Sequence, residues 1–198
     1  LEVERINKYI ENEEIQEYYT ALNNTPLIIE KFLDKNISHI KKIVKSLDES
    51  ANFFFLARGI SIATAKEGGL KLKEIACRFI EGYSAAHAKH GPISLVREGF
   101  PIIFIAPPDE TYERLVGNVM EFKARGGYII SVVVDSDETI TELSDATIRI
   151  EQPASKYYNL ITPITFIPAL QLLAYYDAVL NGFDPDQPLN LAKTVTVH

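Results

Sequence analysis

Short apolar runs alternate with longer amphipathic stretches through most of this chain of 198 residues. The runs cover residues 51–57 (ANFFFLA), 100–106 (FPIIFIA) and 128–134 (YIISVVV), and a short fourth strand is predicted at 146–150 (ATIRI). Continuous apolar runs bounded by polar residues are typical of strands buried on both faces. The intervening stretches carry apolar residues at spacings of three and four, which predicts helices. This alternation predicts an α/β fold in which a flavodoxin-like parallel sheet is flanked by helices.

The intervening stretches also carry signals for helix ends. Ser61 is a candidate N-cap for a helix that continues to about Phe79. A second helix is predicted over 109–124, because the cation and glycines expected at a C-terminus follow it. The apolar segment 160–180 predicts a buried helix, and residues 80–91 are predicted to form a loop of small residues.

Residues 1–48 are predicted to be an N-terminal helical extension, and residues 49–198 the main domain with a C-terminal tail. Within the extension, Asn23-Asn24-Thr25-Pro26 is typical of a helix start, because polar capping residues precede a proline of the first turn. We therefore expect separate helices before residue 18, up to residue 33, and from 36 to 47. We expect the apolar stripe of the extension to pack on a neighbouring domain or subunit.

Composition and charge narrow the possible partners. A net charge of −7 argues against nucleic-acid binding and against polybasic membrane contact. No leader peptide is visible and no apolar run is long enough to span a bilayer, so we expect no membrane association. The single cysteine, Cys77, is predicted to be buried in its helix and is compatible with a reducing, cytoplasmic location. Because the chain begins with Leu1, we expect it to be part of a longer protein.

A charged stripe on the helix 61–79 is the strongest candidate for chemistry. Its members lie three or four residues apart and share a face: Glu67, Lys71, Glu74 and Arg78. One interpretation is a solvated face held by the ion pairs Glu67–Lys71 and Glu74–Arg78, which on spacing alone is the commoner case. The other is that Lys71 tunes Glu74 as a general base. The many Ala and Gly residues of this helix favour close packing by another element.

The segment Lys89-His90-Gly91-Pro92 places a histidine on a tight loop. His90 is a candidate proton carrier, because histidine titrates near neutral pH, and a structural or surface role fits the pattern equally well. His87 lies three residues earlier, but no carboxylate or cysteine stands near the two histidines at ligand spacing. We therefore expect no metal and no cofactor.

Two further segments could contact a substrate. Arg58-Gly59-Ile60-Ser61 resembles a phosphate-accepting turn at a helix N-terminus, but its single glycine matches no phosphate-binding fingerprint and we favour a structural role. Lys193 lies in the polar tail, where a lysine amine could close over a sugar and attack its carbonyl group.

Four segments together resemble the sugar isomerase (SIS) domain family. Within it, the resemblance is closest to the second of the two SIS domains in glutamine–fructose-6-phosphate aminotransferases. The segments are RG…AKEGGLKLKEI from Arg58, KHGPISL from Lys89, PALQLLAYYDAVLNG from Pro168 and DPDQPLNLAKTVTVH from Asp184. The last segment is the most specific. The chain departs from the family at 86–88, where Ala-His-Ala replaces the usual Gly-Glu-Leu.

This resemblance implies an isomerase domain that forms glucosamine-6-phosphate from fructose-6-phosphate and ammonia. Glu74 would be the base that moves a proton between C1 and C2 of the sugar, with Lys71 as its neighbour. Lys193 would form a Schiff base with the sugar, and Ala192 would contact it. His90 would promote ring opening and reach the site of a partner subunit, which implies a homodimer.

The resemblance also implies parts that these 198 residues do not contain. The loop that binds the sugar phosphate belongs to the first SIS domain, and a glutaminase domain can precede it. We therefore expect the chain alone to be inactive. The alternatives are a glucosamine-6-phosphate deaminase or related aminosugar-phosphate isomerase that has SIS domains only, and a non-catalytic module that binds a phosphosugar.

Overall fold

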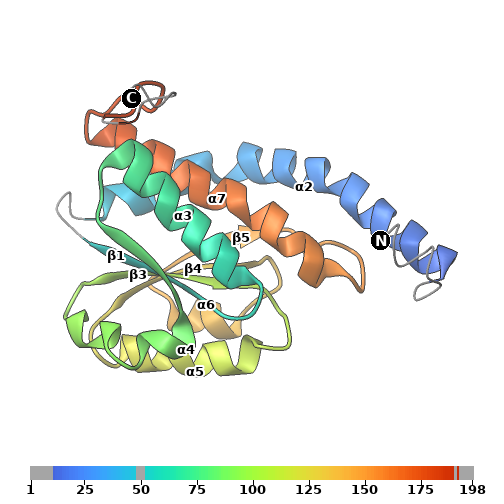
Figure 1. Cartoon of the computed structure of the whole chain (residues 1–198), viewed down its shortest axis with the longest axis horizontal. Coiled ribbons are helices and arrows are strands. Elements are labelled where there is room, and N and C mark those ends of the chain that lie inside the picture. The colour runs from blue at the N-terminus through green and yellow to red at the C-terminus, as the bar shows by residue number, and fades with distance from the viewer. Residues whose placement is uncertain (1–10, 48–51, 190, 192–198) are drawn as a thin grey trace, which may run out of the picture.

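The computed structural model describes residues 11–47, 52–189 and 191. In this part of the chain, a parallel sheet of five strands lies between two layers of helices (Figure 1). The strand order is β2-β1-β3-β4-β5, the flavodoxin-like order. The strands are β1 (Phe53–Ala57), β2 (Ile80–Ser84), β3 (Pro101–Ala106), β4 (Tyr128–Val134) and β5 (Ala146–Ile150). The predicted fold class is confirmed.

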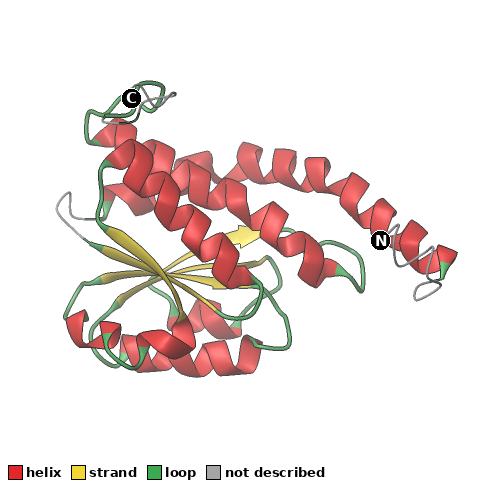
Figure 2. Cartoon of the chain, viewed as in Figure 1, coloured by secondary structure: helices red, strands yellow, loops and turns green. Residues whose placement is uncertain are grey.

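The helices divide between the two faces of the sheet (Figure 2). One face is covered by α2 (Asn12–Lys45), α3 (Ser61–Ala76) and α7 (Tyr158–Leu180). The other is covered by α4 (Ala85–Ala88), α5 (Tyr112–Lys123) and α6 (Thr139–Leu143), with a short 3₁₀ helix, η1 (Pro92–Leu95), after α4. Alternate strand residues point to opposite faces, so Phe55 belongs to the first core and its neighbour Phe54 to the second.

The edge strand β2 was missed by the sequence analysis, which predicted a loop over 80–91. Its sequence, IEGYS, contains no apolar run, and only Ile80 is buried. Residues 80–84 nevertheless pair with all of β1, so that Gly82 lies opposite Phe55. An edge strand that is half exposed does not show the apolar run by which a central strand is recognised.

The helix α2 corrects a second expectation, because one continuous helix of 34 residues replaces the predicted succession of shorter ones. Pro26 lies inside it. Proline removes a backbone donor and normally ends a helix, but Thr25, Ile28 and Phe32 are buried on either side of this turn. This packing holds the helix together across Pro26. The domain boundary at residue 48 stays a prediction.

The helix α7 is long and apolar enough to cross a membrane by length and composition, although we expected no such run. Half of its most apolar window is buried inside the domain. It packs along α2 and α3, as Figure 1 shows, and its buried residues belong to the core of that face. These contacts are those of a core helix in a globular domain.

Three expectations about α3 are wrong in detail. Ser61 is its first residue and is buried, whereas Ile60 occupies the N-cap position. The helix ends at Ala76, and Cys77 follows in the left-handed conformation with φ 52°. Cys77 is exposed, not buried, because this left-handed residue turns the chain out of the helix.

Candidate functional site

A cluster of one lysine and two glutamates lies on the outer face of α3. The Nζ atom of Lys71 lies 2.7 Å from Oε2 of Glu74 and 3.5 Å from Oε1 of Glu67. About a third of each side chain is exposed. The hydrogen bond to Glu74 raises the pKa of Lys71, so Lys71 is cationic at neutral pH. The structure thus brings together two residues that the sequence analysis singled out, Lys71 and Glu74.

Glycines let α3 approach its neighbours closely enough to fix this cluster. A Cβ atom on Gly68 would lie 2.7 Å from Cδ1 of Leu170 on α7 and 3.0 Å from the ring of Phe55 on β1. On the edge strand, a Cβ atom on Gly82 would lie 2.7 Å from Cα of Lys66. A side chain at Gly82 would require the backbone of α3 to move, and one at Gly68 would displace Leu170 or Phe55. The charged face is therefore carried by a helix that is tightly packed on two sides.

The fourth member of the predicted stripe, Arg78, has a different role from the one expected. We expected an ion pair between Glu74 and Arg78. Instead, the Arg78 guanidinium forms a buried two-pronged pair with Asp177 of α7, at 2.8 Å from Nε and 2.6 Å from Nη2. Arg78 lies beyond the left-handed Cys77, so it has left the helical face that Glu74 occupies.

His90 lies on an exposed loop between α4 and η1. Lys89 anchors this loop through a 2.7 Å ion pair with Glu121 of α5. Burial favours a higher pKa for Glu121, but the hydrogen bonds from Lys89 and Asn118 outweigh it, and the net pKa is lowered. The loop is therefore tied to the α5 side of the sheet.

The structure does not bring His90 and Glu74 together within one chain. Leu72 and Ala76 of α3 pack in the core on one face of the sheet. Ala85 and Ala88 of α4, just before His90, pack in the core on the other face. Glu74 and His90 therefore lie on opposite sides of the sheet, as the placement of α3 and α4 in Figure 1 shows.

The turn after β1 faces the loop after β3, at the point where the strand order reverses and such folds commonly bind ligands. Gly59 has φ 54°, and a Cβ atom there would lie 3.3 Å from Cγ2 of Thr111. The carboxylate of Asp109 accepts hydrogen bonds from the backbone N–H (2.8 Å) and hydroxyl (2.6 Å) of Thr111. An acidic group thus stands where an anionic ligand would need donors, which supports the structural role that we favoured for this turn.

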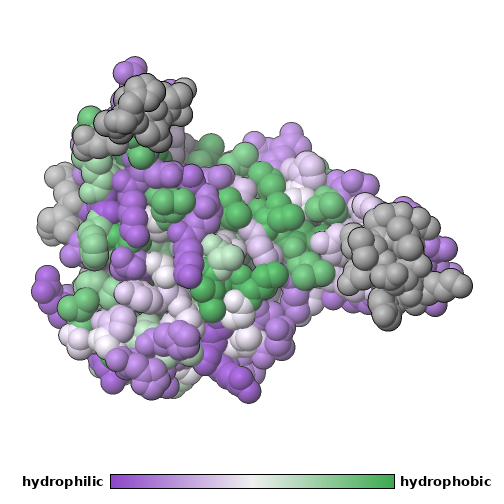
Figure 3. All heavy atoms as spheres, viewed as in Figure 1, coloured by the Kyte–Doolittle hydropathy of each residue, from purple (hydrophilic) through white to green (hydrophobic). Residues whose placement is uncertain are grey.

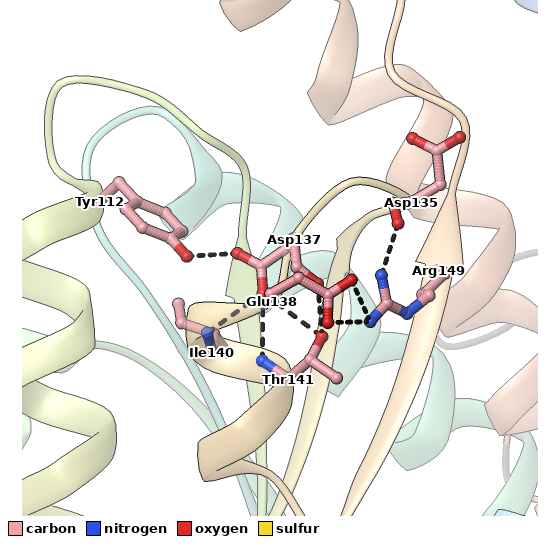
Figure 4. Close-up of polar contacts among 7 residues, drawn as sticks. All are labelled: Tyr112, Asp135, Asp137, Glu138, Ile140, Thr141 and Arg149. Atoms are coloured by element: carbon pink, nitrogen blue, oxygen red, sulfur yellow. Dashed lines mark hydrogen bonds and ion pairs between the residues drawn. The ribbon is translucent and has the colours of Figure 1, made fainter.

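A second polar cluster, which the sequence analysis missed, lies beyond the ends of β4 and β5 (Figure 4). Asp137 accepts hydrogen bonds from the backbone N–H groups of Ile140 (3.1 Å) and Thr141 (3.0 Å) and from the hydroxyl of Tyr112. Burial, followed by this bond to Asp137, raises the pKa of Tyr112 to about 12. Arg149 donates to the backbone oxygen of Asp135. These contacts fasten the loop before α6 to α5 and β5.

Lys193 and Ala192 lie outside the described residues, so their roles stay predictions. Among the residues that the structure describes, no three His, Cys, Asp or Glu side chains are grouped so that they could hold a metal ion. His87 is exposed on α4.

Comparisons with known proteins place this chain in a family. The SIS domain profile matches residues 46–180. The isomerizing glutamine–fructose-6-phosphate aminotransferase of Pyrococcus horikoshii is 44% identical over 172 residues, which are 87% of this chain and 28% of the relative. The protein of that name from Thermococcus kodakarensis is 38% identical over 185 residues, 92% of this chain and 30% of the relative.

A solved structure shows the same relationship. The C-terminal domain of glucosamine-fructose-6-phosphate aminotransferase from Francisella tularensis matches with a TM-score of 0.83 and 30% identity, over 92% of this chain and 50% of that one. The resemblance stated from the sequence is confirmed. The chain spans 28% and 30% of the length of the two relatives, and most of their length has no counterpart in it.

Proposed function

Since the chain belongs to the SIS domain family, we propose that it is the second SIS domain of a glutamine–fructose-6-phosphate aminotransferase. In this proposal it supplies part of the site that forms glucosamine-6-phosphate from fructose-6-phosphate and ammonia. The observation that carries the proposal is the Lys71–Glu74 pair, which presents a carboxylate beside a fixed cation on a tightly packed helix. Such an arrangement suits a base that removes a proton from carbon.

The proposed chemistry needs an amine and a carboxylate around one open-chain ketose. The Lys193 amine forms an imine with C2 of the sugar and releases water, with Ala192 against the sugar, and ammonia then replaces the lysine at C2. The C2 imine acidifies the protons on C1. Glu74 removes one of them and returns a proton to C2, while the hydroxyl proton on O1 passes to the nitrogen at C2. The C2 imine thus becomes an amine and C1 becomes the aldehyde of the aldose. Lys71 offsets the negative charge that spreads near Glu74 during the transfer.

The phosphate of the substrate requires residues from outside this chain. At the point where the strand order reverses, the Asp109 carboxylate lies beside the Gly59 turn and is bonded to Thr111. An anionic group there would meet a like charge. This supports a phosphate-binding loop on the preceding SIS domain. Without that domain, the chain alone cannot bind the substrate and is inactive.

A second subunit is also part of the proposal. Because Glu74 and His90 of one chain lie on opposite sides of the sheet, His90 reaches a Glu74 site only on a neighbouring subunit. Exposed apolar side chains gather over α2 and α7 (Figure 3). They include Leu27, Leu160, Ile164 and Tyr175, each at least 41% exposed. A surface of this kind suits contact with another domain or subunit. We place the full protein in the cytoplasm.

The test is an assay of the full-length protein with fructose-6-phosphate, supplied with glutamine or with ammonia. The proposal predicts glucosamine-6-phosphate from either nitrogen source. Formation from ammonia alone, with release of ammonia from glucosamine-6-phosphate, would instead indicate the deaminase. Binding of the sugar phosphate without turnover would indicate a non-catalytic module and contradict the proposal.

A further inference from the structure

The end of α3 is joined to the last turns of α7 by a buried ion pair. The side chains of Arg78 and Asp177 are 6% and 2% exposed. Nε and Nη2 of Arg78 each donate to one carboxylate oxygen, at 2.8 and 2.6 Å. The amide of Asn181 donates to the backbone oxygen of Asp177 (2.8 Å) and to its Oδ1 (3.2 Å). A two-pronged pair of this kind fixes direction as well as distance.

The pair lies where three helices end. A cavity of about 190 Å³ beside Arg78 is lined by residues from the ends of α2 and α7, namely Val44, Lys45, Leu47, Leu180 and Asn181. Helix C-termini carry partial negative charge, so a guanidinium is favoured among them. Arg78 also lies over the ring of Phe53, at 5.3 Å from the centroid. An arginine, with its planar fork, suits these contacts better than a lysine.

The backbone links this pair to Glu74. The N–H of Arg78 donates to the carbonyl oxygen of Leu72 across the left-handed Cys77, which closes the last turn of α3. Glu74 lies within that turn. A displacement of the Arg78 side chain is therefore passed directly to the segment that carries the Glu74 carboxylate.

α3 packs along α7, and two specific contacts lie on either side of the charged pair. Gly68 packs against Leu170, and ten residues later Arg78 pairs with Asp177. Leu170 and Asp177 are seven residues apart, two turns along one side of α7. Lys71 and Glu74 lie between the two contacts. With the ion pair removed, the last turn of α3 keeps the apolar packing of Leu72 and Ala76 but loses the polar contact that fixes its end.

We propose that Arg78 and Asp177 are positioning residues that set the place of the Glu74 carboxylate in the site. This inference rests on the proposed function, because Glu74 needs a fixed position only if it transfers a proton. The pair touches neither substrate nor reacting atoms. Proton transfer depends steeply on placement, since a shift of about 1 Å can lower a rate about 10²-fold.

The test compares variants of the full-length protein. Removing one partner alone leaves a buried charge, so the informative changes are Arg78→Lys and the double change Arg78→Met with Asp177→Leu, which removes both charges of the pair. Lys73→Met is the matched control, because it removes the exposed 3.8 Å pair with Glu81 from the same helix. For each, kcat and KM are measured, and amide hydrogen exchange is followed over residues 70–76.

For both test variants, the inference predicts a fall in kcat of about 10²-fold with KM within about twofold, and exchange over 70–76 at least about tenfold faster. The control keeps the kcat of the parent. Unchanged kcat in the folded double variant, in a protein that Glu74→Gln inactivates, would overturn this inference and leave the proposed function standing. If the parent itself has no turnover, the proposed function fails. In that case, faster amide exchange over 70–76 in the test variants still supports the attachment of α3 by the Arg78–Asp177 pair. Unchanged exchange overturns that attachment.

Discussion

Lys71 bonds Glu74 at 2.7 Å and Glu67 at 3.5 Å, so one ammonium group lies between two carboxylates on the same face of α3. The hydrogen bond to Glu74 raises the pKa of Lys71, which keeps this cation in place at neutral pH. The two carboxylates have similar exposure and share a partner. They therefore allow a direct comparison, because only Glu74 is proposed to transfer a proton.

In the full-length protein, we expect Glu74→Gln to lower kcat about 10²–10⁴-fold while sugar-phosphate binding is retained, because the amide cannot accept the proton. Glu67→Gln, which removes the other carboxylate beside Lys71, is expected to change kcat less than about threefold. Steady-state kinetics and calorimetric binding measure both. Equal losses from the two changes would show that the charged face acts only as a whole and that Glu74 has no special role.

The close packing of α3 gives a second prediction. Gly68→Ala places a methyl group 2.7 Å from Leu170 and 3.0 Å from Phe55, so we expect the free energy of unfolding to fall by about 1–3 kcal/mol. Gly117→Ala is the control, since it lies on the exposed side of α5 with open space around it, and should stabilise by about 0.5–1 kcal/mol. Urea unfolding measures both changes. A Gly68 variant as stable as the parent would mean that α3 is not held as closely as described.

Cys77 offers a stabilising change. It holds φ 52°, a conformation that costs a residue with a Cβ atom about 1 kcal/mol and costs glycine almost nothing. We expect Cys77→Gly to raise the free energy of unfolding by up to about 1 kcal/mol. Cys77→Ala, which keeps the Cβ atom, should leave it nearly unchanged. A loss of stability in the glycine variant would indicate that the cysteine side chain makes a contact of its own.

The raised pKa of Tyr112 predicts that the stability of the protein depends on pH. Its pKa rises from 10.0 to about 12 in the folded protein, so the folded state keeps the proton more tightly than the unfolded state. The stabilisation is therefore fully present below pH 10 and is lost as the pH rises through about 12. We expect Tyr112→Phe to destabilise by about 1–2 kcal/mol below pH 10, through loss of the bond to Asp137. The difference from the parent should shrink across this window, and a difference that grows with pH would contradict the assignment.

The fold could be predicted wherever a strand is buried on both faces. The runs at β1, β3 and β4 are nearly continuous apolar segments because helices cover both of their sides. β5, at the other edge of the sheet, buries only Ile148 and Ile150. The edge strand β2 has a neighbour on one side only, and its Gly82 is needed for contact with α3. Neither feature requires a run of apolar residues in the sequence. Likewise, the continuity of α2 through Pro26 depends on burial against distant elements, which local signals do not show.

The parts of the site that could be predicted are those formed by residues close together in the sequence. Lys71 and Glu74 are three residues apart on a helix, so their contact follows from helical geometry. Arg78 and Asp177 are 99 residues apart, and nothing in the local pattern distinguishes Asp177 as the partner from Glu74. The bond between Tyr112 and Asp137 is also set by tertiary packing, and so is the position of Thr111 beside the Gly59 turn.

The central claim is that Glu74 of one subunit works with His90 of another, and mixed dimers test it most directly. Full-length Glu74→Gln and His90→Ala proteins are each assayed alone and then after unfolding and refolding together in equal amounts. The account predicts little activity from either alone and recovery to about a quarter of the parent's kcat in the mixture, since half of the dimers then contain one intact site of two. A mixture no more active than its separate components would contradict the account.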